Sequence, residues 1–279
     1  RDYEQRFFLP NYPNRFPHVP FWDSSQTDNI LLLHAEQGLG DTLQWIRYLP
    51  LVLKRCQRVL LECQASLIPF IKTLHLPIEF FSQGDILPHF DLHLPLFSLP
   101  VVFKTTLDTI PEIPSFSLPR RLLSKAEILK IGIAWAGSPT NRNDSNRSCS
   151  LHHFSSLLTL PNTQFFSFQL GEHSTDRTLL ENPDLLTDLS PNIHHFLDTA
   201  TLLTQMDLII SVDTALVHLA GTLRKPVGVL LCSVPDWRWG LNRDTSPWYP
   251  TAQLFRQKIQ GEWEDVFKEV LHSIESVHS

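Results

Sequence analysis

Asp207-Leu-Ile-Ile-Ser-Val-Asp-Thr-Ala-Leu-Val-His218 is the stretch of the sequence that decides the fold. Its first residues, 207–212, are largely apolar and predict a buried strand. A short turn at Asp213 leads into residues 214–223, which predict a helix, and the run 226–231 predicts another buried strand. Strand, turn, helix and strand in this order build a parallel α/β sheet. Ligands of such sheets bind beyond the carboxyl ends of the strands, so the turn is a candidate site.

The same alternation of strands and helices runs through the rest of the chain. The apolar runs predict further strands over 29–35, 58–62, 78–81, 91–94, 130–137 and 164–169. Apolar residues at helical spacing predict helices over 42–55, 66–74, 151–160, 199–205 and 262–278. Pro50 is expected to kink the first of these helices.

A proline-rich stretch, residues 105–119, separates two such series and predicts an interdomain linker. We therefore predict an α/β fold of two Rossmann-like domains, whose parallel sheets face a cleft. The first domain covers residues 1–119, linker included, and the second covers residues 120–279 with a terminal helix.

The opening residues, 1–25, contain Pro10, Pro13, Pro17 and Pro20, which exclude a long helix. They predict an extended lead-in that packs on a domain surface. Because the chain opens on Arg rather than Met, we expect it to be a piece of a longer protein.

Composition narrows the class of function. Charged residues make up 19% of the chain and the net charge is -6, which argues against a nucleic-acid partner. The four cysteines form no C-x-x-C pair, so a zinc site is not expected, and their sparsity suits a reducing compartment. No apolar run has the length of a membrane span, and we expect no secretory signal. We expect a cytoplasmic protein, either free or peripheral to the inner membrane.

The stretch Ser211-Val-Asp-Thr-Ala-Leu-Val-His218 offers the groups that bind a diphosphate. The backbone N–H groups of Thr214 and Ala215 would lie at the start of a helix, where positive potential favours anions. His218 lies one turn further on the same face and can donate to phosphate or ribose. The alternative is that Asp213 only caps the helix and His218 is a satisfied structural residue.

Gly38-Leu-Gly-Asp41 also follows a predicted strand and opens a helix. Gly38 and Gly40 let the backbone turn sharply and approach a ligand closely. Asp41 either caps the helix or serves as a base.

The polar loop 135–148 follows another strand and holds Trp135, Ser138, Arg142 and Arg147. The two arginines can neutralise a leaving diphosphate by charge-assisted hydrogen bonds. The alternative is a solvated loop.

Several further side chains lie next to strands or in loops and could reach a donor. Gln169, Glu172 and Asp198 are candidates for contacts to a nucleoside. Trp237 belongs to an aromatic group in 235–249 that can stack on a sugar or a base, or can instead anchor the terminal helix. No Asp-x-Asp pair, P-loop, G-x-S-x-G or H-E-x-x-H motif is present, so we expect no metal site and no cofactor.

Four stretches in order resemble one known family. Residues 34–50, Gly132-Ile-Ala-Trp-Ala-Gly-Ser-Pro139, residues 210–221 and Asp236-Trp-Arg-Trp239 are similar to motifs of the glycosyltransferase domain that follows tetratricopeptide repeats in many bacterial proteins. That domain is related to the ADP-heptose:lipopolysaccharide heptosyltransferases of glycosyltransferase family 9.

The resemblance implies a GT-B fold and an inverting, metal-independent transfer from a nucleotide sugar. It places the acceptor, a glycan, a lipid-linked saccharide or a protein, in the first domain and the donor in the second. Asp41 matches the carboxylate taken as general base, and Arg147 falls near the basic residue that meets the donor phosphate. Residues 213–218 match a donor-binding Asp-Thr-Gly-Leu-x-His pattern, with Ala215 in place of the usual glycine. Tetratricopeptide repeats, the usual N-terminal partners, are not within this chain.

Two other classes of function stay open at this point. One is a non-catalytic module that binds a sugar nucleotide or a protein. The other is a GT-B sugar-nucleotide epimerase, which would need further carboxylates such as Glu36 or Glu172.

Overall fold

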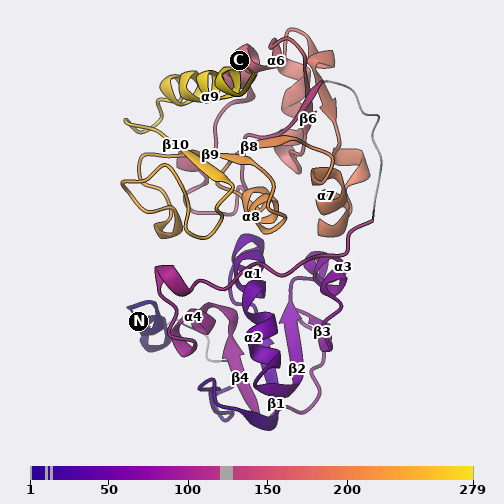
Figure 1. Cartoon of the computed structure of the whole chain (residues 1–279), viewed down its shortest axis with the longest axis vertical. Coiled ribbons are helices and arrows are strands. Elements are labelled where there is room, and N and C mark those ends of the chain that lie inside the picture. Colours follow the sequence, from indigo (N-terminus) through magenta and orange to yellow (C-terminus); the bar gives the residue numbers. More distant parts are fainter. Residues whose placement is uncertain (1, 10–11, 13–14, 120–127, 279) are drawn as a thin grey trace. The chain divides into compact units, whose positions relative to one another are not determined.

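The computed structural model describes residues 2–9, 12, 15–119 and 128–278, and it divides into two compact units (Figure 1). Unit 1 is Arg1–Ser117 and unit 2 is Leu118–Ser279. The boundary expected between residues 119 and 120 touches residues 120–127, which lie outside the described part. Each unit is described separately below.

Unit 1 is a four-stranded parallel sheet with the strand order β3-β2-β1-β4. Its strands are β1 (Thr27–His34), β2 (Cys56–Cys63), β3 (Ile78–Ser82) and β4 (Leu92–Pro95). Its α-helices are α1 (Leu39–Trp45), α2 (Leu49–Leu53), α3 (Ile68–Ile71) and α4 (Leu99–Val102). The apolar runs 31–33 and 59–61 are buried completely, or almost so, because neighbouring strands and covering elements exclude water from both faces.

The first helical segment differs from the single helix expected over 42–55. The helix α1 begins at Leu39, so Asp41 lies in its first turn rather than in the preceding loop. A 3-10 turn, Ile46–Tyr48, separates α1 from α2, and Pro50 lies in the first turn of α2. Proline is tolerated there because the first N–H groups of a helix have no internal partner.

The lead-in also differs from the extended segment that we expected. Residues Asp2–Phe8 form 3-10 turns, and Arg6 is buried. Pro10 and Pro13 lie outside the described residues.

Unit 2 is a six-stranded parallel sheet with the strand order β10-β9-β8-β5-β6-β7. Its strands are β5 (Leu129–Ala134), β6 (Thr163–Ser167), β7 (Leu186–Asp188), β8 (Leu208–Val212), β9 (Val227–Leu231) and β10 (Ala252–Arg256). Its α-helices are α5 (Asp144–Arg147), α6 (Ser155–Leu158), α7 (Phe196–Leu203), α8 (Ala215–Thr222) and α9 (Glu264–His278). The sequence did not predict the edge strands β7 and β10, because one has only three residues and the other carries polar Gln253 and Arg256.

The order of the strands in unit 2 locates its ligand edge. Counted along the unit, the sheet runs 3-2-1-4-5-6, so the order reverses between β5 and β8. Figure 1 shows α6 and α9 on one side of this sheet and α7 and α8 on the other. Since both faces are covered, the open edge beside the carboxyl ends of β5 and β8 is where a ligand is expected to bind.

Unit 1 reverses its strand order in the same way, between β1 and β4.

Among the described residues, no helix combines the length and the apolar character needed to cross a membrane.

Close packing of α8 against the loop before β10 depends on a glycine. A Cβ atom placed on Gly221 would lie 2.4 Å from Cγ and Cδ1 of Tyr249, whose ring is fully buried. We expect Gly221→Ala to destabilise the protein by about 1–3 kcal/mol through overpacking. In an unstrained helix the same change stabilises by about 1 kcal/mol.

Urea unfolding of the variant measures this effect. The control is the same change in a Tyr249→Ala background, where the clash is gone and the loss should vanish. An equal loss in both backgrounds would rule out this packing as the cause.

Candidate functional site

The loops that follow β5 and β8 meet through Arg147. Its Nη1 donates to the backbone carbonyl of Asp213 at 2.9 Å, and its Nε pairs with Asp144 at 3.2 Å. A Cβ on Gly137 would lie 2.3 Å from Nη2 of Arg147, so the guanidinium lies directly over this glycine. The structure thus brings two of the predicted donor residues, Arg147 and Asp213, together where the strand order reverses.

The start of α8 is capped by a hydroxyl and not by the carboxylate considered above. Thr214 is the N-cap residue, and its Oγ1 accepts a hydrogen bond from the N–H of Leu216 at 3.3 Å. Ser211, fully buried, lies with its Oγ 3.3 Å from the same hydroxyl. Ala215 is half-buried in the first turn. The Asp213 carboxyl is therefore not needed as the cap of α8.

The Asp213 carboxyl lies in an environment that disfavours its charge. Burial is the largest influence and raises the pKa of Asp213, while the nearby guanidiniums of Arg238 and Arg147 oppose that shift. A carboxyl with a raised pKa at a ligand edge is a common feature of functional sites, although structural networks also produce it.

His218 lies inside a hydrogen-bonded chain and is only 2% exposed. Its Nδ1 lies 2.9 Å from the Tyr249 hydroxyl, and its Nε2 lies 3.2 Å from Nη1 of Arg238. Because a guanidinium only donates, Nε2 is the acceptor and Nδ1 carries the proton. Both ring nitrogens are thus occupied, and His218 positions Arg238 and Tyr249 in this structure.

Arg238 was not among the predicted site residues. It is mostly buried, and its Nε lies 2.9 Å from the Asp236 carboxylate. The signal for it was present in the sequence, since the residue lies in the stretch Asp236-Trp-Arg-Trp239. In the sequence the tryptophans of this stretch stand out, and only the fold shows that the arginine reaches His218.

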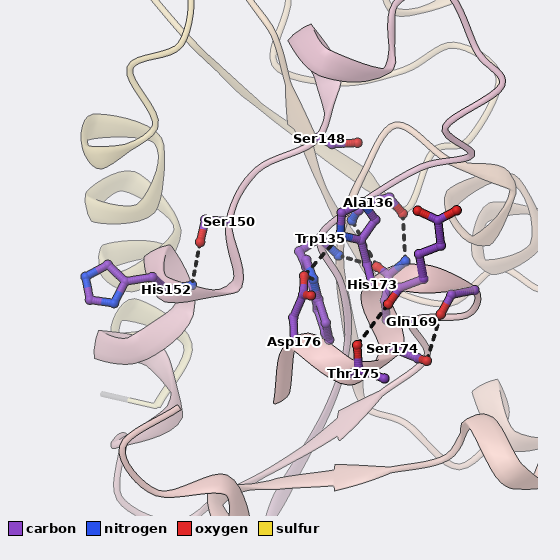
Figure 2. A network of polar contacts seen from close by, with 12 residues as sticks. Trp135, Ala136, Ser148, Ser150, His152, Gln169, His173, Ser174, Thr175 and Asp176 are labelled. Carbon is purple, nitrogen blue, oxygen red and sulfur yellow. Dashed lines mark hydrogen bonds and ion pairs between the residues drawn. The ribbon is translucent and has the colours of Figure 1, made fainter. Parts of the chain in front are cut away.

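Gln169 holds the backbone of the loop after β5, as Figure 2 shows. Its Oε1 accepts from the N–H groups of Trp135 and Ala136 at 3.0 and 2.9 Å, and its Nε2 donates to the carbonyl of Ala136 at 3.1 Å. The Trp135 indole is fully buried and donates to Asp176 at 3.0 Å (Figure 2). The side chains of Gln169 and Trp135 therefore support this loop from within.

The other predicted donor residues of unit 2 are more exposed. Asp198 accepts from the N–H of His195 at 3.1 Å and caps its own helix, α7. Trp237 is 54% exposed and makes an edge contact with Trp248. Ser138, Arg142 and Glu172 lie in exposed loops or turns.

In unit 1, Asp41 closes the start of α1. Its Oδ2 accepts from the N–H of Gly38 at 2.9 Å. Gly38 itself has φ -68° and ψ 172°, which any residue can adopt, so the turn does not require a glycine for its dihedral angles. A Cβ on Gly38 would lie 3.2 Å from that oxygen, so glycine leaves room for the carboxylate. Gly40 lies in the first turn of α1 beside Asp41.

Within the described residues, no group of three or more His, Cys, Asp and Glu side chains is arranged to hold a metal ion.

The raised pKa of Asp213 predicts an effect on stability. Its ionised form is less favourable in the folded than in the unfolded protein, so Asp213→Asn should raise Tm at neutral pH. The folded state binds the proton more tightly, so the gain should grow as pH rises from the acid range and disappear where the carboxyl is protonated in both states.

Thermal unfolding between mildly acidic and neutral pH measures this gain. Exposed Asp184 provides the control, because Asp184→Asn removes a charge that stays in water. A fall in Tm for Asp213→Asn at neutral pH would contradict the argument.

Part of unit 2 also matches a known protein family. Residues 177–265, which include α8 and Arg238, match glycosyltransferase family 9 (heptosyltransferase). Protein FlbA of Caulobacter vibrioides is 22% identical over 94% of this chain and 49% of FlbA, so the chain spans about half the length of that relative.

Two solved structures have a similar fold. A family 9 glycosyl transferase from Veillonella parvula has a TM-score of 0.64 at 10% identity, over 92% of this chain and 100% of that one. ADP-heptose LPS heptosyltransferase II from E. coli has a TM-score of 0.57 at 11% identity, over 89% of this chain and 99% of that one. A segment of unit 2 thus matches glycosyltransferase family 9, and the likeness to these solved structures shows that the two parallel sheets have the GT-B fold.

Proposed function

We propose that the chain is an inverting glycosyltransferase that moves a sugar from a nucleotide-sugar donor to a hydroxyl of an acceptor without a metal ion. The acceptor is a glycan, a lipid-linked saccharide or a protein. Tetratricopeptide repeats ahead of this chain stay a prediction from the resemblance.

The observation that carries the proposal is the junction of Arg147 with the turn before α8. The N–H of Ala215 has no partner within its own helix, because the first N–H groups of any helix lack one. Arg147 is held 2.9 Å from the carbonyl of Asp213 in the same turn. A helix start and a guanidinium at the reversal of the strand order are suited to the diphosphate of a donor.

The other proposed donor-site residues fall into two groups, exposed ones that would contact the donor and buried ones that would support those contacts. Exposed Arg142 and Ser138 can contact phosphate oxygens, and the ring of Trp237 can stack on a base or a sugar. Asp213 accepts from hydroxyls of the donor. Trp135, Gln169 and His218 support these contacts from inside the unit.

Asp41 is proposed as the general base. The acceptor oxygen forms a bond to the anomeric carbon while the bond from that carbon to the diphosphate oxygen breaks. The hydroxyl proton passes to Asp41, and the nucleoside diphosphate leaves as an anion at the start of α8. One such displacement inverts the anomeric configuration.

A non-catalytic binding module and a sugar-nucleotide epimerase are the two alternative functions, and each predicts a different outcome in activity and binding assays. A non-catalytic module would bind the nucleotide without turnover. An epimerase would need additional carboxylates, and Glu36 is already paired with Arg6 at 2.7 Å, while Glu172 is exposed on a turn of unit 2. Formation of an epimer from the donor alone would favour that activity.

The donor site is tested by thermal shift with a panel of nucleoside diphosphates. We expect a rise in Tm that is selective for one base, because a ligand at 100 times its Kd stabilises by about 2.7 kcal/mol. Arg147→Gln should reduce this rise. The control is Lys268→Gln, which removes an exposed charge on α9. Equal shifts for all bases, or no effect of Arg147→Gln, would refute the donor site.

The base is tested by Asp41→Asn. The amide keeps an oxygen for the N–H of Gly38 but cannot accept the proton, so transfer should fall by about 10²–10⁴-fold. The nucleotide-induced thermal shift should stay unchanged. Asp28→Asn, at an exposed position of the same unit, is the control and should keep full transfer. Full activity of Asp41→Asn would exclude this residue as the base.

A further inference from the structure

The connection between β9 and β10 is a long loop, residues 232–251, that starts at the ligand edge of unit 2. It follows β9, which pairs with β8 in the sheet. The helical part of this loop is the short 3-10 turn Trp237–Trp239. A long loop with few internal hydrogen bonds depends on contacts from other elements to keep one conformation.

Two side chains hold the start and the middle of this turn. Asp236 is its N-cap residue, and Oδ1 of Asp236 accepts from the N–H of Arg238 at 3.1 Å. The Arg238 guanidinium donates to Nε2 of His218 on α8 at 3.2 Å. The turn is therefore joined to the helix whose start is proposed to bind the diphosphate.

The end of the turn is held by Arg256, the last residue of β10. Nη2 of Arg256 donates to the carbonyl of Trp239 at 2.6 Å, and Nε donates to the carbonyl of Arg243 at 3.1 Å. The carbonyls at the end of a helical turn have no partner within the turn. One guanidinium thus closes the turn and joins it to the residues that follow.

Gly240 gives the backbone the bend between these two carbonyls. It has φ 62° and ψ -176°, a conformation that is essentially restricted to glycine. A Cβ atom on Gly240 would lie 3.3 Å from Cδ of Arg243, so the Arg243 side chain lies directly over this residue. The bend and the guanidinium therefore act on the same part of the loop.

The position of Arg256 has a cost to stability. Burial is the main cause that lowers the pKa of Arg256, and the charge of Arg243 lowers it further. Nη1 of Arg256 is buried and has no hydrogen-bond partner among the described residues. The acceptors of Nε and Nη2 are neutral carbonyls rather than a carboxylate. Departures from good pairing of this kind are expected at functional sites.

We propose that Arg256 is a positioning residue of the donor site, which holds the turn 237–239 so that Trp237 and Arg238 meet the donor in one conformation. The Trp237 ring is 54% exposed, while the backbone that carries it is held at both ends of the turn. A ring that is fixed before binding loses less conformational freedom when a base or a sugar stacks on it. The effect on the donor rests on the proposed function, whereas the hold of Arg256 on the turn does not.

Fluorine NMR on the full chain labelled with 5-fluorotryptophan tests the turn without a nucleotide. Trp237→Phe assigns the Trp237 resonance. We expect Arg256→Met to shift or broaden this resonance, because the turn then samples several conformations. The control is Arg177→Met, which should leave the resonance unchanged. Arg177 also donates to two backbone carbonyls, those of Pro183 and Leu186, but Leu186 opens β7 at the opposite edge of the sheet.

Calorimetric titration with ADP, UDP and GDP measures the consequence for binding. We expect Arg256→Met to raise the Kd of the diphosphate that binds the wild-type protein roughly 2–10-fold. Arg256→Lys keeps the charge but lacks the planar fork that reaches two carbonyls, so its Kd should lie between those of Arg256→Met and the wild type. Arg177→Met should leave the Kd unchanged.

Gly240→Ala keeps the test valid where Arg256→Met does not fold. It strains the same bend and leaves the guanidinium in place, so it should change the Trp237 resonance and raise the Kd in the same direction. Tm of each variant reports whether it is folded. If Arg256→Met is unfolded, Arg256→Lys and Gly240→Ala decide in its place, and wild-type behaviour of both would overturn the proposal.

The results separate this inference from the donor proposal. An unchanged Trp237 resonance in folded Arg256→Met, or an equal change in Arg177→Met, would overturn the hold of Arg256 on the turn. An unchanged Kd in Arg256→Met would overturn its part in donor binding. A changed resonance together with no nucleotide binding by the wild-type protein would uphold the hold on the turn and refute the donor proposal.

Discussion

In each sheet the first strand along the chain lies inside, and later strands are added on both of its sides. The positions of the candidate site residues depend on this strand order. In parallel strands all carboxyl ends share one edge, and covering helices close both faces, so the loops at that edge are the part left open to a ligand. The reversal lies between β5 and β8 in unit 2 and between β1 and β4 in unit 1. The Arg147 junction occupies the first of these places and the histidine pair His34–His93 occupies the second.

Both places contain polar groups that packing alone would disfavour. The Asp213 carboxyl has a raised pKa beside Arg238, and His34 holds a buried nitrogen without a partner among the described residues. In the loop after β5, by contrast, the buried amide of Gln169 is matched by the backbone of Trp135 and Ala136. Polar groups that packing disfavours are common where binding and stability compete.

Local sequence predicted the four strands of unit 1 and the central strands of unit 2, and it missed both edge strands of unit 2. The apolar runs that became β1, β5, β8 and β9 were recognisable because strands covered on both faces need continuous apolar residues. The edge strands β7 and β10 were missed, since β7 has only three residues and β10 carries polar side chains such as Gln253. The start of α1 was placed too late because the helix begins at Leu39, within a glycine-containing stretch that we interpreted as a loop.

The sequence by itself determined the α/β class, the succession of the main strands along the chain and the turn with Asp213 between β8 and α8. Apolar periodicity and glycine or aspartate at turns are local properties, and they can be recognised without knowing the fold. Only the tertiary structure decided that Arg147 reaches the turn before α8, that Arg238 and Tyr249 enclose His218, and that His34 and His93 meet. The residues of these contacts lie 20 or more positions apart, and the order of strands in each sheet sets which of them become neighbours.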